Sequence, residues 1–460
     1  MAKPLLHRRA SRLLLGASTL ALLGASAAFP MASALAGPNP PPPPKHPTGV
    51  VLYVSPHGTD TSNSCTTRND PCQTIQHAVA VAPSKATIEV EPGTYTVDIA
   101  STSTNPYGGI DIFQPVSIEA QGHVVITGTG PIFTLYDSSS PSSGVTGVTI
   151  EGFAFDDITG SGYNGVITTP GYGSGDVTIA RNTFSDITDE AVGYHGNQGL
   201  ASPLGTGWRV VGNTVTEVTH STRSGMFFGD LSDSVIEANT ISDTGHAGIL
   251  LTAVGASPAS NSNNEVIGNQ VSDVPYEGIQ VAYGNGILIR DNSVSHAGLA
   301  CMVSSPPSGC ASGALSSASA IMLYNPGQTN ITVIDNSATD SYNGLAVGQP
   351  PYSPSENLGA GIAVLRNDFT NDVHAGIADY APTTSAALNA MLNWWGCAAG
   401  PNATGCTGTI GSVDYTPWAT HPYPAPPPAP KGPPSPPKGP KGPPSPPKGP
   451  KGPPSPPGHK

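Results

Sequence analysis

Residues 177–187 read V-T-I-A-R-N-T-F-S-D-I, and variants of this phrase recur through the middle of the chain. Each copy places an Asn between two short runs in which β-branched residues alternate with polar ones, a pattern that indicates strands with one buried face. The separations between successive anchor Asn residues are 31, 26, 30, 23, 44 and 31. The anchors are Asn182, Asn213, Asn239, Asn269, Asn292, Asn336 and Asn367.

A second phrase follows most anchors, in which a His or Tyr precedes a small or polar residue, a Gly and an aliphatic residue. Examples are His246-Ala-Gly-Ile and Tyr276-Glu-Gly-Ile. Each unit therefore predicts a strand, an Asn turn, a short strand, a Gly turn and another short strand. Such a unit cannot bury its apolar face alone, but stacking units about 4.8 Å apart closes a core and aligns the Asn amides in a ladder. The sequence predicts an all-β solenoid with one unit per coil, and the 44-residue separation predicts a long excursion.

These repeats and the two ends of the body resemble the right-handed parallel β-helix proteins of the pectin-lyase-like superfamily. The N-terminal segments are LYVSPHGTD (52–60), PCQTIQHAV (71–79) and TIEVEPGTY (87–95). The C-terminal segments are NWWGC (393–397) and VDYTPW (413–418). The resemblance spans nearly all of residues 50–420. It implies a first strand, a capping helix, an opening coil and a closing segment.

The capping helix also follows from the residues themselves. Thr74 suits an N-cap, and Ile75, Ala78, Val79 and Ala82 share one helical face. We expect this apolar face to cover the exposed end of the solenoid.

The two ends of the chain differ in composition from its body. Residues 1–36 combine a basic start, an apolar run shorter than a membrane span and small residues that suit cleavage, which predicts a signal peptide. Residues 37–47 predict an extended proline-rich linker, 48–424 the parallel β-helix domain, and 425–460 a proline- and lysine-rich repeat tail. A secreted or cell-surface location follows. The tail either binds an anionic cell-wall polymer or serves as a stalk.

Composition and charge exclude several classes of protein. Charged residues make up only 11% of the 460 residues, too few for helices with charged outer faces. Between residues 48 and 424 there are 31 acids and seven Lys or Arg, a net charge of 7 − 31 = −24, and the tail adds six Lys. An acidic body repels nucleic acid, so we expect no nucleic-acid partner. A polysaccharide or cell-wall glycan is the expected partner, and the chain is expected to be a monomer.

The six cysteines form three close pairs. An even count, short spacings and an exported chain together predict disulfides, and the spacings do not suit zinc. The predicted pairs are Cys65 with Cys72, Cys301 with Cys310, and Cys397 with Cys406.

Two polar columns follow when the units are aligned on their anchors. Four residues beyond the anchors lie Asp186, Glu217, Asp243, Asp273, His296 and Asp340, with Asp157 from a degenerate first copy. Seven residues beyond lie Asp189, His220, His246, Tyr276 and His374. Acids, imidazoles and a phenol in neighbouring coils can move protons on a sugar ring, and an Arg can hold a uronate carboxylate. The predicted catalytic residues are Glu217, His220, Asp243, His246 and Asp273, and the predicted binding residues are Arg223, Tyr276 and Glu277.

A structural interpretation stands beside the catalytic one. Asp residues at turns accept backbone hydrogen bonds, so the acidic column can be a ladder of turns. The His and Tyr residues before the Gly can simply cover surface. The catalytic interpretation requires Glu217, His220, Asp243 and His246 to line one patch.

The resemblance implies specific chemistry that this chain lacks in intact form. Lyases of this fold hold calcium with Asp clusters and use Arg or Lys as base, hydrolases use closely set Asp residues, and epimerases use an Asp-Pro-His-Glu motif. None of these arrangements is intact here. A body with a net charge of −24 repels a polyanion unless calcium screens the charge. Neutral glycans are therefore the substrates that fit this charge better. We expect no cofactor and no resident metal, and the sequence leaves open whether calcium is required.

Two classes of function therefore remain. The first is a carbohydrate-active protein that binds a polysaccharide along the solenoid and acts as a hydrolase, lyase or epimerase. The second is a non-catalytic structural or adhesion module displayed on the proline-rich stalk, and the sequence leaves open whether the chain is an enzyme. A groove flanked by tyrosines favours the first class, and a smooth polar surface the second. The tyrosines concerned are Tyr163, Tyr194, Tyr276, Tyr342 and Tyr380.

Overall fold

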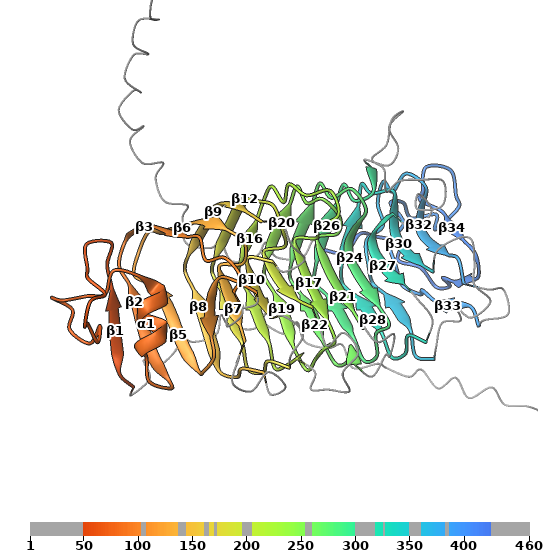
Figure 1. Ribbon diagram of the computed structural model, residues 1–460. Coiled ribbons are helices and arrows are strands. Elements are labelled where there is room, and N and C mark those ends of the chain that lie inside the picture. Colours follow the sequence, from red (N-terminus) through yellow and green to blue (C-terminus); the bar gives the residue numbers. More distant parts are fainter. Residues whose placement is uncertain are drawn as a thin grey trace, which may run out of the picture. The chain divides into compact units, whose positions relative to one another are not determined.

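The computed structural model describes most of the body of the chain (Figure 1). The described residues are 49–102, 107–136, 144–160, 165–169, 173–195, 205–253, 260–299, 318–324, 327–348, 360–381 and 386–424. The predicted signal peptide, linker and tail, and the Cys301–Cys310 pair, lie outside them. Within these residues no helix has the length and apolar character needed to cross a membrane.

Within the described residues, the chain winds through three long sheets in turn, and every strand pairing between named strands is parallel. Sheet 1 opens each coil. It consists of β1 (Val51–Val54), β2 (Ala86–Val90), β5 (Val116–Ala120), β8 (Val148–Glu151), β11 (Thr178–Ala180), β15 (Arg209–Val211), β19 (Val235–Glu237), β22 (Glu265–Ile267), β25 (Leu288–Arg290), β28 (Thr332–Ile334), β31 (Ala363–Leu365), β33 (Leu388–Asn389) and β35 (Val413–Asp414).

Sheet 2 follows the anchor Asn of each coil. It consists of β3 (Gly93–Val97), β6 (Val124–Thr129), β9 (Ala154–Thr159), β12 (Thr183–Ile187), β16 (Thr214–Val215), β20 (Thr240–Ser242), β23 (Gln270–Ser272), β26 (Ser293–Ser295) and β29 (Ser337–Thr339).

Sheet 3 completes the coil. It consists of β4 (Ile110–Ile112), β7 (Phe133–Leu135), β10 (Ile167–Thr169), β13 (Val192–Tyr194), β17 (Met226–Gly229), β21 (Ile249–Thr252), β24 (Glu277–Ala282), β27 (Ser319–Tyr324), β30 (Asn343–Val347), β32 (Ala375–Asp379) and β34 (Thr409–Ile410). A short additional pair joins β14 (Gly205–Thr206) to β18 (Leu231–Ser232). This right-handed parallel β-helix confirms the predicted fold.

The predicted Asn ladder is present between sheets 1 and 2. The Asn239 side-chain amide donates to the Val210 carbonyl and to Asn269 Oδ1, each at 2.9 Å, and its own Oδ1 accepts from the Asn213 backbone N–H at 2.9 Å. The pattern repeats from Asn182 upward. It ends on Asn393, which accepts from the Asn367 amide and which the sequence alignment did not include. Each buried amide is thus hydrogen-bonded by its neighbours in the column.

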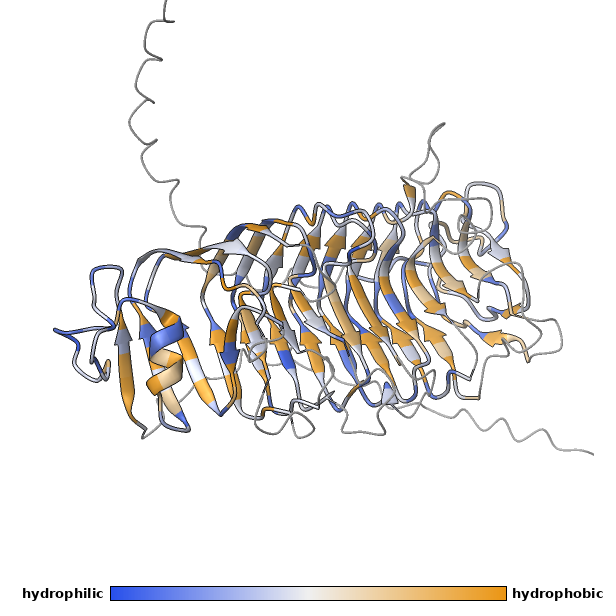
Figure 2. Cartoon of the chain, viewed as in Figure 1, coloured by the Kyte–Doolittle hydropathy of each residue, from blue (hydrophilic) through white to orange (hydrophobic). Residues whose placement is uncertain are grey.

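The core lies inside the three sheets. Strands of sheets 1 and 2 alternate buried and partly exposed residues, as the pattern of β25 and β26 shows. Ile289 and Val294 are fully buried. In Figure 2 hydrophobic colour runs along the stacked strands, whereas many of the turns between them are hydrophilic. Burial of these aliphatic stripes is what joins one coil to the next.

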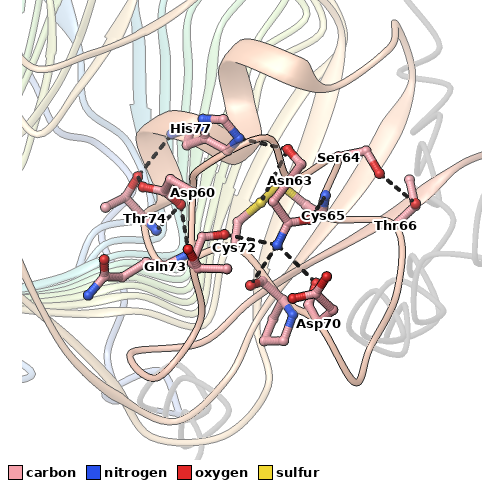
Figure 3. The surroundings of a disulfide bond; sticks show 12 residues. Asp60, Asn63, Ser64, Cys65, Thr66, Asp70, Cys72, Gln73, Thr74 and His77 are labelled. Atoms are coloured by element: carbon pink, nitrogen blue, oxygen red, sulfur yellow. Dashed lines mark hydrogen bonds between the residues drawn. A yellow bond between two sulfur atoms is a disulfide. The ribbon is translucent and has the colours of Figure 1, made fainter.

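The predicted capping helix is α1 (Ile75–Val81), with Thr74 as N-cap accepting from the His77 amide at 3.1 Å. Ile75, Ala78 and Val79 are buried against the first coils. The Cys65–Cys72 disulfide lies beside this helix, as Figure 3 shows.

The loop that carries this disulfide is held by hydrogen bonds as well as by the covalent bond. The Asn63 amide donates to three backbone carbonyls, and its oxygen accepts from the Cys65 amide at 2.8 Å. At the other end of the solenoid, Cys397 and Cys406 form the second predicted disulfide, beside the fully buried Trp395.

Candidate functional site

The acidic column predicted after the anchors is present as a column of exposed turns between sheets 2 and 3. The pairings of β12, β16, β20 and β23 place Asp186, Glu217, Asp243 and Asp273 in register. Their φ angles are 49°, 58°, 54° and 55°, the left-handed conformation that Asp and Asn adopt in turns. This geometry agrees with the turn-ladder interpretation. A catalytic role for Glu217, Asp243 and Asp273 stays a prediction.

His220 leaves the second predicted column because its coil is longer than its neighbours. Val215 to Met226 spans 11 residues, whereas Phe184 to Val192 and Ile241 to Ile249, at equivalent positions, each span 8. The three extra residues place His220 in an exposed turn, where its Nδ1 lies 3.3 Å from the Thr222 amide. Arg223 takes the position in register with Asp189 and His246.

We call the resulting column the sheet 3 row. It is the position just before sheet 3 in successive coils. In three of these coils it lies four residues before Gly193, Phe227 and Leu250, which pair with one another in sheet 3. The coil between those of Gly130 and Asp189 contributes no described residue to the row. The described members of the row are Tyr107, Gly130, Asp189, Arg223, His246, Tyr276, Ala318, Tyr342 and His374.

A pocket of about 540 Å³ lies in this row at Gly130, which has no side chain to fill it. A Cβ added at Gly130 would meet no atom within 4 Å, so the glycine opens the space. Tyr107 lines one end of the pocket, Asp189 lines the other, and Asp98 joins them from the turn after β3. A pocket of this size with an aromatic ring and two carboxyl groups suits one or two sugar rings.

Asp189 connects the pocket to a buried ionic cluster. Arg223 Nε lies 2.8 Å from Asp189 Oδ1, and its Nη1 lies 3.7 Å from Glu190 Oε1. Glu190 is only 2% exposed, and its Oε2 has no hydrogen-bond partner. Burial, then its hydrogen bond to Asp189 and the charge of Asp189, raise the pKa of Glu190 well above its ordinary value, although Arg223 opposes the shift. Glu190 is therefore a carboxylic acid at neutral pH, next to the Asp189 carboxylate.

His195 lies close to the same cluster. Its ring stacks on Phe227 with centroids 4.8 Å apart, and its Nε2 is buried without a hydrogen-bond partner. Burial lowers the pKa of His195 to about 4, and Asp189 only partly offsets this. The imidazole is therefore neutral at pH 7.

A second cluster follows along the sheet 3 row, and it contains three of the predicted residues. His246 Nε2 lies 4.0 Å from Glu277 Oε2, and the His246 and Tyr276 ring centroids are 5.0 Å apart. Burial raises the pKa of Glu277 to about 8 and lowers the pKa of His246. A protonated carboxyl group thus faces a neutral imidazole, a pair that can donate and accept protons.

Sequence reasoning missed the groups around the pocket. Asp189 was aligned in the polar column, but Glu190, His195 and Asp98 were not chosen as candidates. A usable signal exists, because Glu190 and Glu277 both lie eight residues after their anchors, Asn182 and Asn269. Eight residues after their anchors, the other coils carry Ser, Ala or Gly.

The predicted tyrosine groove is not present in the form expected. Tyr194 is buried against Trp208, with centroids 5.4 Å apart, and Tyr380 is 6% exposed. Tyr163 lies outside the described residues. Tyr276 and Tyr342 do lie in one line, because both belong to the sheet 3 row.

Comparison with known proteins gives one family and several solved structures. The model of a family described as periplasmic copper-binding protein (NosD) matches residues 157–385. The mannuronan C-5 epimerase AlgE6 A-module of Azotobacter vinelandii is similar at 13% identity and a TM-score of 0.41, over 73% of this chain and 90% of that one. A rhamnogalacturonan lyase is similar at 12% identity and 0.40, over 81% and 87%. A pectate lyase, Pel9A, is similar at 16% identity and 0.34, over 63% and 76%.

No curated protein matches the sequence. The coils themselves define the class, a solenoid of three parallel sheets with an internal Asn ladder and a helical cap. The chain is a right-handed parallel β-helix repeat protein, and its fold resembles that of the pectin-lyase-like superfamily.

Proposed function

We propose that this chain is an exported glycan-processing protein that hydrolyses a neutral polysaccharide at the pocket of the sheet 3 row. The observation that carries the proposal is the Asp189–Glu190 pair. Two adjacent carboxyl groups, one ion-paired and one kept protonated by burial, occur at the edge of a pocket. Pairs whose surroundings push their protonation states apart are typical of acid–base catalysis.

The pair provides a proton where a glycosidic oxygen can meet it. Asp189 contacts the pocket, whereas Glu190 lies behind it and holds a proton that Asp189 can accept and pass on. Arg223 Nε lies 2.8 Å from Asp189 Oδ1 and orients this carboxyl group at the pocket. Asp189 is the group that contacts substrate, and Glu190 and Arg223 position it and set its charge.

Asp98 is another carboxyl group at the same pocket. It lines the same pocket from the turn after β3, three coils before Asp189. Hydrolases place one carboxyl group to protonate the leaving oxygen and another to activate water or attack the sugar. Three coils correspond to about 14 Å, more than the roughly 5–9.5 Å between such a pair, so Asp98 is not assigned the water-activating role.

The charge of the cluster favours a neutral substrate. Arg223 already faces two carboxyl groups, so a uronate carboxylate would compete with Asp189 and Glu190 for the same guanidinium. The net charge of −24 on the body adds a general repulsion of polyanions.

A copper site, which the family description suggests, does not fit the matched region. Among the described residues, the group of three His, Cys, Asp or Glu side chains close enough to hold one ion is Cys65, Cys72 and His77. It lies outside residues 157–385, and its two sulfur atoms are joined in a disulfide. The described residues also contain no group of three carboxylates close enough together to hold one calcium ion. The family's periplasmic description and the two disulfides support an extracytoplasmic location.

Reducing-end assays over a panel of neutral and acidic polysaccharides test the proposal. We expect release of reducing ends from a neutral polymer, and Glu190→Gln and Asp189→Asn should each lower kcat by about 10²-fold or more. Activity should also fall on the alkaline side as Glu190 loses its proton. Asp186→Asn is the matched control, because Asp186 is an exposed residue of β12 in the same coil, and it should keep wild-type kcat.

Variants of the predicted residues separate the two candidate sites. If Glu217→Gln, Asp243→Asn and Asp273→Asn abolish activity while Glu190→Gln does not, the exposed turns and not the pocket form the active site. The runner-up function is a non-catalytic surface module, and the continuous ladder of exposed turns favours it. No turnover on any polymer by the wild-type protein would establish that function in place of hydrolysis.

A further inference from the structure

Three side chains that can bind a metal ion meet beside the capping helix. Cys65 and Cys72 lie in the loop between β1 and α1, and His77 lies in α1. The two sulfur atoms and a ring nitrogen of His77 all lie within 4.8 Å of one another. Figure 3 shows the imidazole beside this loop, with its Nε2 2.8 Å from the Asn63 carbonyl oxygen.

Backbone hydrogen bonds to β1 hold both cysteines without the help of the S–S bond. The Tyr53 N–H donates to the Cys65 carbonyl at 2.7 Å, and the Tyr53 carbonyl accepts from the Cys72 N–H at 2.9 Å. The Ser55 N–H donates to the Cys72 carbonyl at 2.8 Å. Because both cysteines are bonded to the same residue of one strand, their side chains stay adjacent when the sulfur atoms are not joined.

The rest of the loop and the helix are held separately as well. The Asp60 carboxylate accepts from the backbone N–H groups of Gln73 and Thr74 at 2.7 and 3.1 Å. Thr74 caps α1 through the His77 N–H, and the Asn63 side chain binds the loop carbonyls described above. All three potential ligands are therefore positioned by contacts other than the disulfide.

The dimensions and chemistry of this group suit Zn²⁺. Zinc binds Cys sulfur at about 2.3 Å and His nitrogen at about 2.0–2.1 Å, so the donors of a tetrahedral site are about 3.5–3.8 Å apart. Two unjoined sulfur atoms reach that spacing by rotation of their side chains. The spacing of the two cysteines along the sequence does not suit zinc by itself, but α1 supplies the missing ligand, and water can fill the fourth position.

We propose that Cys65, Cys72 and His77 bind Zn²⁺ while the two cysteines are thiols, before their disulfide forms. Binding releases one proton from each thiol, because the thiolate is the ligand. The disulfide then forms by exchange with an oxidant that itself carries a disulfide. The two thiolates lose two electrons and join, the oxidant takes up two electrons and two protons, and Zn²⁺ leaves.

The ion and the disulfide thus exclude each other on the same side chains. A bound ion occupies both thiolates, so it slows their exchange with other disulfides and keeps the pair from joining the wrong cysteine. None of these steps depends on the proposed glycan or on the pocket.

Zinc binding by the reduced full-length chain tests the proposal. The protein is reduced with a phosphine, its fold is checked by circular dichroism, and it is dialysed against Zn²⁺ alone. Reduced wild type should hold one more Zn²⁺ than the Cys65→Ser/Cys72→Ser variant, and oxidised wild type should hold none at this site. Cys397→Ser/Cys406→Ser is the matched control. Among the described residues no third ligand joins that pair, so this variant should keep the ion.

Variants of the imidazole show whether the site has three ligands or two. His77→Gln keeps a side-chain N–H for the Asn63 carbonyl but lacks the ring nitrogen. Its affinity for Zn²⁺ should fall about 100-fold or more, since even the groups behind a ligand are each worth about 10- to 100-fold. His57→Ala removes an exposed imidazole near the same loop and should leave the affinity unchanged.

The rate of disulfide formation gives a second readout. Saturating Zn²⁺ should slow oxidation of Cys65 and Cys72 in the wild type, and a chelator should restore the rate. Equal zinc contents in reduced wild type and the Cys65→Ser/Cys72→Ser variant would overturn the proposal, as would an unchanged affinity in His77→Gln. Loss of the fold on reduction would also overturn it, because the site requires a loop that is held without the S–S bond.

Discussion

The surroundings of Glu277 disfavour the ionised form of its carboxyl group. Its side chain is 9% exposed, one of its oxygens lacks a hydrogen-bond partner, and its nearest ionisable partner is a neutral imidazole. Burying such a group costs stability, and folded proteins rarely keep it without a use. Glu190, in the same position of another coil, is likewise buried with one oxygen unpaired, although Arg223 Nη1 lies 3.7 Å from its other oxygen.

The raised pKa of Glu277 predicts a pH-dependent stability. The folded protein keeps a proton up to about pH 8, whereas the unfolded chain releases it near 4.5. The unfolded state therefore binds fewer protons in that interval, and the free energy of unfolding falls as pH rises from about 4.5 to 8. Urea unfolding should be measured at several pH values over this range. The free energy of unfolding of the Glu277→Gln variant should fall less than that of the wild type, by on the order of a few kcal/mol. Identical pH profiles for the two proteins would contradict a protonated Glu277.

At the scale of elements, the Asn ladder connects the turns between sheets 1 and 2. Each Asn both donates to and accepts from neighbouring coils, so removing one leaves several buried groups unpaired. For Asn239 these groups are the Val210 carbonyl and the Asn213 backbone N–H, whereas the Asn269 oxygen keeps the backbone N–H of residue 239 as its donor.

Asn239→Ala should therefore lower the free energy of unfolding by about 3 kcal/mol or more, from the lost hydrogen bonds and the unpaired groups. Chemical denaturation checks this. Ser242→Ala, a partly exposed position of β20 in the same coil, should change stability by less than about 0.5 kcal/mol. A small effect at Asn239 would mean that core packing alone holds the coils in register.

Elements were predictable where the sequence repeats. The anchors, the exposed turns and the capping helix each follow from local residue types, because one Asn, one turn residue or one N-cap fixes local backbone geometry. The position of Arg223 was not predictable from the sequence. A three-residue insertion shifts the register of its coil, and no residue in that coil marks where the extra residues lie. The pocket was not predictable either, because it depends on Gly130 and on residues from four coils that no single motif joins.

For the whole molecule, charge is the property that limits the substrate. The body carries −24, and an acidic polymer must approach it against that field. Salt screens this repulsion, with a Debye length of about 8 Å at physiological ionic strength.

Binding to neutral and acidic polysaccharides should therefore respond differently to salt. Affinity electrophoresis at low and high ionic strength should show a nearly constant affinity for the neutral polymer. Any affinity for a polyuronate should rise with salt. Tight polyuronate binding at low salt would contradict the proposed preference and favour a lyase or epimerase.

The most direct test is a crystal structure of the Glu190→Gln protein with an oligosaccharide of the active polymer. The account predicts a sugar ring in the pocket between Tyr107 and Asp189, its glycosidic oxygen in hydrogen-bond distance of Asp189, and further rings following the sheet 3 row. A glycan bound at the exposed turns of Glu217, Asp243 and Asp273, with the pocket empty, would contradict it.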